Sequence, residues 1–183
     1  VGANPAEPAA VQKILETTGV SGGLVVHVGC GDGRLTAALR ADDRYLVHGL
    51  DRDAQQVEAA RRLIRSLGLY GPVSVEQWTG RRLPYADNLV NLAVVRGPTS
   101  VAREELLRVL CPGGVAVFTT DQGQRTADKL VKPWPQEMDE WTHYLYDPSN
   151  NAVSRDTAVG PPQHLQWAVE PKWARSHDHL STT

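Results

Sequence analysis

The chain has 183 residues, a formal net charge of −2 at pH 7 and 41% hydrophobic residues. These values suit one globular domain of ordinary size with an appendage. The near-neutral charge gives no support for nucleic-acid binding through a basic surface, and no apolar run approaches the length of a membrane span. The two cysteines, Cys30 and Cys111, are too few for a disulfide scaffold and lack metal-ligand spacing.

The chain begins with small residues and prolines at positions 1–8, which we expect to form a flexible leader. From residue 9 to residue 120 the hydrophobic pattern alternates between helix and strand periods. The predicted elements are a helix at Ala9–Thr18, a strand at Leu24–Val28, a helix at Arg34–Arg40, a strand at Tyr45–Leu50, a helix at Asp53–Leu67, strands at Val73–Gln77 and Leu89–Val95, a helix at Val101–Leu110 and a strand at Val115–Thr120. This order predicts a Rossmann-like, doubly wound α/β domain over residues 9–120 with a mostly parallel sheet.

The most informative segment is the strand at Leu24–Val28 with the Gly-x-Gly-x-Gly turn that follows it at residues 29–33. A buried strand, a glycine turn and a helix start bring backbone N–H groups to one point. Side chains at Gly29 or Gly31 would keep a ligand away from that backbone. The segment therefore predicts a nucleotide-type cofactor site.

A second element supports this site. Asp51 follows the next predicted strand and lies about 20 residues after Gly29, the spacing at which a carboxylate accepts hydrogen bonds from ribose hydroxyls. The alternative is that Asp51 caps the helix that begins near Ala54. Ligands of doubly wound sheets bind at the carboxyl ends of the strands, where both the turn and Asp51 are expected.

The composition changes after Thr120, where four of the five tryptophans and four of the six histidines lie. We expect residues 121–183 to be a loop-rich extension that wraps the first domain or begins a second one. The chain ends without a closing element, which favours a fragment of a longer protein. His177 and His179 could share one face of a strand as metal ligands, but two ligands do not make a site, so ordinary polar contacts are the simpler explanation.

Four motifs in this order resemble class I S-adenosylmethionine-dependent methyltransferases: Val25–Gly33, Leu46–Asp53, Leu83–Asn88 and Glu105–Gly114. The resemblance covers about two thirds of the chain. It implies that S-adenosylmethionine, or its product S-adenosylhomocysteine, lies with its methionine moiety and ribose against the turn formed by Gly29, Cys30, Gly31 and Gly33. It also implies that Asp51 holds the ribose hydroxyls and that Arg52 lies beside the adenine.

Three further positions take their roles from the same resemblance. Thr79 and Gly80 align with the pair that contacts adenine in the family. Arg96 falls where the fourth strand ends, on the substrate side. The resemblance identifies no catalytic residue, and the methyl acceptor is unknown.

The chain departs from the family pattern at three positions where the family usually has an acid: His27, Thr79 and Asn91. Each change removes a hydrogen-bond acceptor or a charge, and the loss of several would weaken cofactor binding by one or more orders of magnitude. The alternative is that Thr79 contacts adenine through a neutral hydrogen bond and that His27 does something equivalent. The sequence leaves both possibilities open.

The tail carries a second resemblance, over Asp139–Asp147, Val159–Trp167 and Arg175–His179. These stretches are similar to the junction between a methyltransferase-like domain and a PQQ-binding-like β-propeller in large bacterial proteins typical of planctomycetes. That resemblance implies a periplasmic or extracellular location, whereas an active methyltransferase would be cytoplasmic. Two functions follow: methyl transfer to an unknown acceptor, or a non-catalytic module that packs on or docks a β-propeller domain of the same polypeptide. The spacing of the glycines argues against a dinucleotide-dependent oxidoreductase.

Overall fold

The structure is a computed structural model that describes residues 6–97, 101–120 and 125–157. The chain divides into two compact units, Val1–Trp134 and Pro135–Thr183. In the first unit the elements are α1 (Ala6–Thr18), β1 (Gly23–Val28), α2 (Arg34–Ala38), β2 (Tyr45–Asp51), α3 (Ala54–Ser66), β3 (Val73–Gln77), β4 (Val90–Arg96), α4 (Arg103–Val109), β5 (Leu110–Thr120) and β6 (Arg125–Val131).

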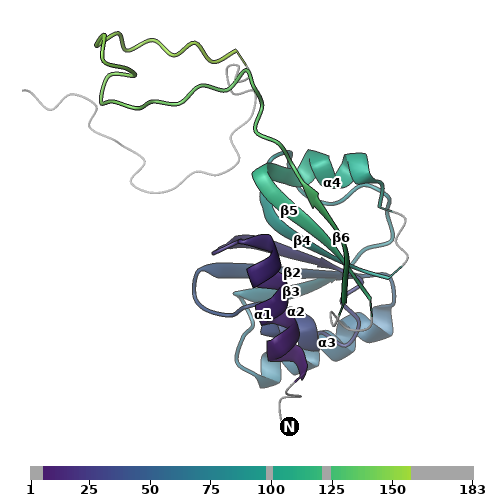
Figure 1. The fold of residues 1–183 in the computed structure, drawn as a ribbon. Helices are drawn as coiled ribbons and strands as arrows, with labels where there is room; N and C mark the ends of the chain where they lie inside the picture. Colours follow the sequence, from purple (N-terminus) through teal and green to yellow (C-terminus); the bar gives the residue numbers. More distant parts are fainter. Residues whose placement is uncertain (1–5, 98–100, 121–124, 158–183) are drawn as a thin grey trace, which may run out of the picture. The chain divides into compact units, whose positions relative to one another are not determined.

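The first unit is built on one six-stranded sheet with the strand order β3-β2-β1-β4-β5-β6 (Figure 1). Strands β1 to β5 are parallel, and β6 pairs with β5 in the antiparallel sense. The predicted Rossmann-like, mostly parallel sheet is therefore confirmed. The strand order reverses between β1 and β4, which is the place where such sheets bind ligands.

The two faces of the sheet bury different sets of side chains. On one face Val25, Val47 and Val94 pack with apolar residues of α1, α2 and α3, including the fully buried Ile14 and Ile64. On the opposite face, α4 packs its apolar side against the alternate residues of the same strands. This two-sided burial explains why the central strands are almost continuously apolar.

Several boundaries differ from the sequence prediction, beginning with α1, which starts at Ala6 within the segment 1–8 that we expected to be a flexible leader. Helix α2 ends at Ala38, so it is barely more than one turn long. Helix α4 runs directly into β5 at Leu110, and the Pro-Gly-Gly turn lies within the strand, where the register against β4 shifts between Val90 and Leu92. The sheet also continues past residue 120, because β6 pairs with β5 and leads to Lys132, which exchanges backbone hydrogen bonds with Gly113 and Gly114.

The described part of the second unit, residues 135–157, consists of turns and irregular chain. Its organising residue is Asp139, whose carboxylate accepts hydrogen bonds from the Tyr146 hydroxyl and from the backbone N–H of Arg155. Across the described ranges of both units, no helix is long and apolar enough to cross a membrane.

Candidate cofactor site

The glycine turn lies at the carboxyl edge of the sheet, directly after β1. Gly29, Gly31 and Gly33 all have positive φ angles, of 78°, 55° and 82°, which glycine adopts without strain. The backbone N–H groups of Gly29 and Cys30 both donate to the carbonyl of Leu50, at 2.8 and 3.1 Å. The turn is thereby attached to the end of β2, which brings it beside Asp51.

Asp51 holds the turn rather than the following helix. Its Oδ2 accepts from the N–H of Gly31 at 2.7 Å, and its Oδ1 accepts from the N–H of Asp53 at 3.0 Å. The N-cap of α3 is Asp53, whose side chain accepts from the N–H of Gln55. The alternative in which Asp51 caps the helix is therefore wrong.

The three glycines of the turn meet different neighbours. A β-carbon at Gly29 would lie 3.0 Å from the carbonyl oxygen of Arg96, and one at Gly31 would lie 2.9 Å from Nη1 of the same residue. A β-carbon at Gly33 would instead lie 2.6 Å from Cβ of Ala60, on α3. Gly29 and Gly31 thus allow Arg96 to lie close against the turn, whereas Gly33 allows α3 to pack closely against it.

Two neighbouring cavities open at this edge and share Gly29, Asp51 and Arg96. The smaller one, of about 140 Å³, is lined by Val28, Gly29, Leu50, Asp51, Arg52, Trp78 and Arg96. The larger one, of about 450 Å³, is lined by Gly29, Gly31, Asp32, Asp51, Gln56, Arg96 and Gly97. The structure therefore brings together five of the predicted site residues: Gly29, Gly31, Asp51, Arg52 and Arg96.

Sequence reasoning missed Trp78, which lines the smaller cavity. The residue directly follows β3, and its indole N–H donates to the carbonyl of Arg82 at 2.9 Å, so the ring is held in place. Its position after a parallel strand was the available signal. Thr79 and Gly80 come next in the chain, are exposed, and line neither of the two cavities.

Cys30 has a packing role. Its side chain is buried in the core on the α1–α3 face, and burial followed by the charge of Asp51 raises the pKa of the thiol to about 12. A thiol with this pKa stays protonated at pH 7, so Cys30 is not a nucleophile here.

His27 and Asn91 occupy two of the positions where the family usually has an acidic residue, and their side chains lie in different places. Asn91 lies near the opposite end of β4, where its Oδ1 accepts from the N–H of Leu24 at 2.9 Å. The side chain of Asn91 therefore braces the start of β1, at the opposite edge of the sheet from the glycine turn. His27 is fully buried close to the turn, with its Nδ1 2.8 Å from the hydroxyl of Thr36.

The residues at this edge fit the cofactor that the sequence implies. Each oxygen of Asp51 accepts one backbone N–H, and a carboxylate oxygen can accept a second hydrogen bond, so ribose hydroxyls can still be bound. The smaller cavity adds the apolar surfaces of Val28, Leu50 and Trp78, against which a flat base can pack. Gly29 and Gly31, which have no side chain to cover their backbone, both line the larger cavity.

No group of three or more potential metal ligands occurs among the residues that the structure describes. The predicted pair His177 and His179 lies outside the described residues.

Comparison with known proteins agrees with this geometry. The family model described as "Methyltransferase domain" matches residues 25–114. Methyltransferase GfsG of Streptomyces halstedii is 33% identical over 110 residues, which make up 56% of this chain and 40% of GfsG. The chain thus spans about two fifths of that curated relative.

Solved structures show the same fold. A candidate S-adenosyl-L-methionine-dependent methyltransferase from Methanococcus maripaludis is 25% identical with a TM-score of 0.59, over 65% of this chain and 57% of that one. The [4+2]-cyclase SpnF is 27% identical with a TM-score of 0.54, over 61% of this chain and 43% of its own. Residues 25–114 are therefore similar to S-adenosylmethionine-dependent methyltransferases in sequence, and the first unit shares their fold.

Proposed function

We propose that the first unit binds S-adenosylmethionine at the carboxyl edge of its sheet and transfers the methyl group to an acceptor. The observation that carries this proposal is the position of Asp51, which is fixed by Gly31 and Asp53 and faces both cavities. The match of residues 25–114 to the methyltransferase family supports it.

Individual residues take their roles from this placement. Asp51 accepts hydrogen bonds from the ribose hydroxyls, and Trp78 and Leu50 provide an apolar wall for the adenine. Gly29 and Gly31 line the larger cavity, where the methionine moiety lies close to their backbone. The cofactor supplies an activated methyl group, and the protein's task is to align the acceptor with it, which needs no dedicated pair of catalytic side chains.

The test is isothermal titration of the protein with S-adenosylhomocysteine, with Asp51→Ala and Asp51→Asn as variants. We expect micromolar binding by the unmodified chain. Both substitutions should weaken it by about 100-fold or more, because each removes a charged acceptor of two hydroxyl groups. The melting temperature of each variant is measured alongside, since Asp51 also holds the turn.

Asp53→Asn is the matched control. It removes a carboxylate two positions away, and asparagine caps a helix as well as aspartate does. This variant should bind S-adenosylhomocysteine like the unmodified protein. Absence of binding by the unmodified chain at millimolar ligand would contradict the proposal.

That negative result would favour the non-catalytic module. The comparisons bear on the methyltransferase part of the chain, so docking to a β-propeller remains a proposal drawn from the tail's sequence. The two proposed functions imply different cellular locations. An active enzyme would be cytoplasmic, where its cofactor is made, whereas a propeller fusion would be exported.

A further inference from the structure

Arg96 is the last residue of β4 and lies at the point where the strand order reverses. It is half-buried and lines both cavities at the carboxyl edge. A β-carbon at Gly31 would touch its guanidinium, so this positive group lies over the glycine turn. Arg96 therefore brings a positive charge to the place where β1, β4 and the turn meet.

The guanidinium of Arg96 makes no hydrogen bond or ion pair with the described residues to set beside those of most arginines in the described part of the first unit. Within the ranges that the structure describes, no carboxylate or carbonyl accepts a hydrogen bond from it, although it carries five N–H donors. Six of the other arginines in the described ranges pair with a carboxylate: Arg34, Arg40, Arg44, Arg61, Arg103 and Arg108. A half-buried cation that lacks a partner among the described residues is costly, so its donors are suited to an acceptor of a bound molecule in these cavities.

The acidic groups around the turn make their hydrogen bonds to groups other than Arg96. Asp51 accepts backbone N–H groups with both oxygens, and Asp32 pairs with Arg34 at 3.0 Å. Residue 27, where the family usually has an acid, is a histidine that burial and the charge of Arg96 keep neutral at pH 7. The buried position next to Arg96 therefore supplies no negative charge to neutralise it.

We propose that Arg96 binds an acidic group, a carboxylate or a phosphate, of a molecule seated in the cavities at the carboxyl ends of β1 and β4. A guanidinium matches such groups in a two-pronged arrangement that few other side chains offer. The inference rests on the proposed function for its choice of molecules. The acid is either the carboxylate of the cofactor's methionine moiety or an acid on the methyl acceptor.

The experiment titrates the full chain and its Arg96→Gln variant with S-adenosylhomocysteine, with 5′-methylthioadenosine and with inorganic diphosphate. Methylthioadenosine keeps the nucleoside and the thioether but has no carboxylate. If Arg96 holds the cofactor's carboxylate, the variant should bind S-adenosylhomocysteine about 10- to 100-fold more weakly and methylthioadenosine unchanged. If it holds the acceptor's acid, both affinities stay unchanged, and diphosphate binds the S-adenosylhomocysteine complex of the unmodified protein but not that of the variant.

Two controls complete the design. Arg62→Gln makes the same charge change at an exposed position in the middle of α3 and should alter none of the three titrations. The melting temperature of Arg96→Gln should equal or exceed that of the unmodified protein, because no internal ion pair is lost. Arg96→Lys retains the charge and should keep part of the binding that glutamine removes.

The inference is overturned if Arg96→Gln changes none of the affinities, or if it lowers the melting temperature and weakens all three ligands alike. Failure of the proposed function is a separate result. In that case the unmodified chain does not bind S-adenosylhomocysteine, and diphosphate binding to the free protein, with and without Arg96, still decides the inference.

Discussion

His27 shows how one side chain sets the charge of the site. It is fully buried, its Nδ1 contacts the hydroxyl of Thr36, and its Nε2 has no hydrogen-bond partner among the described residues. Burial, and then the charge of Arg96, lower the pKa of His27 to about 4, against a smaller opposing effect of Asp51. The imidazole is therefore neutral at pH 7, where the family's usual carboxylate would be charged.

This pKa makes His27 a source of acid sensitivity. The folded pKa of about 4 lies below the ordinary histidine pKa of 6.5, so the unfolded chain takes up the proton first as the pH falls. The free energy of unfolding therefore has its full value with respect to His27 above pH 6.5. It falls as the pH drops toward 4, and the loss due to His27 is about 2–3 kcal/mol at pH 4.5. Urea unfolding at pH 7.5 and at pH 4.5 measures this loss of unfolding free energy.

His27→Gln provides the comparison, because glutamine can still bond to Thr36 and does not titrate. Other groups contribute to the acid loss of both proteins, so only the difference between them reports His27. The unmodified protein should lose more stability than the variant over this pH range. Equal losses would mean that His27 is not held neutral in the folded state.

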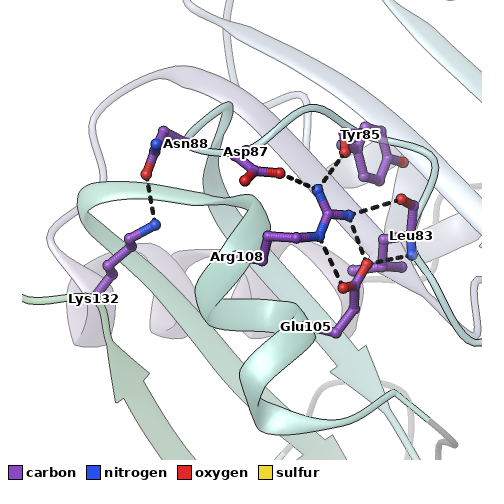
Figure 2. Close-up of polar contacts among 7 residues, drawn as sticks. All are labelled: Leu83, Tyr85, Asp87, Asn88, Glu105, Arg108 and Lys132. Carbon is purple, nitrogen blue, oxygen red and sulfur yellow. Dashed lines mark hydrogen bonds and ion pairs between the residues drawn. The ribbon is translucent and has the colours of Figure 1, made fainter. Parts of the chain in front are cut away.

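At the scale of elements, the loop between β3 and β4 is tied to α4 by the side chain of Arg108 (Figure 2). Its guanidinium donates to the carbonyls of Leu83 and Tyr85 at 3.1 and 2.9 Å, and it pairs with Asp87 and Glu105 at 2.6 Å. Glu105 also accepts from the N–H of Leu83 at 2.6 Å. The hydrogen bonds to Arg108 hold the pKa values of both carboxyls below their usual range.

Removing Arg108 should therefore loosen the loop. Arg108→Ala leaves Glu105, a largely buried carboxylate, without its cation and two carbonyls without a donor, so we expect the free energy of unfolding to fall by about 2–4 kcal/mol. Arg103→Ala is the matched control on the same helix, since its pair with Asp128 is exposed and should contribute less than about 1 kcal/mol. Chemical denaturation of both variants tests this, and equal costs would contradict it.

This contact also marks what the sequence could and could not predict. Leu83–Asn88 and Glu105–Gly114 each stand out as motifs, yet nothing in their periodicity indicates that Arg108 joins them. The turn at Gly29 and the carboxylate at Asp51 were predictable because strand ends and glycines leave a local pattern. Trp78 had only its position directly after a predicted strand as a signal, and a single aromatic residue adds no pattern to that position.

At the scale of the whole molecule, β6 belongs to the first unit, although the sequence placed the end of that domain at residue 120. The strand reads Arg-Thr-Ala-Asp-Lys-Leu-Val and lies at the edge of the sheet, where charged side chains are expected and apolar alternation is weak. Beyond its end, Lys132 donates from Nζ to Asn88 at 2.6 Å, so this segment also reaches the loop held by Arg108 (Figure 2).

The division of the chain can be tested with two truncations. A fragment of residues 1–134 retains the six-stranded sheet and both apolar clusters, so its melting temperature should lie within about 3 °C of that of the full chain. A fragment of residues 1–120 loses the pairing of β6 with β5 and leaves β5 as a bare edge. It should melt at least about 10 °C lower or aggregate.

Circular dichroism melts and size-exclusion chromatography of the two fragments give these quantities. The comparison turns on fourteen residues, 121–134, which add one edge strand and the Lys132 contacts to an otherwise identical chain. If residues 1–120 melted like residues 1–134, the boundary expected from the sequence would be right and β6 would be dispensable. If residues 1–134 failed to fold, the second unit would be needed to complete the first.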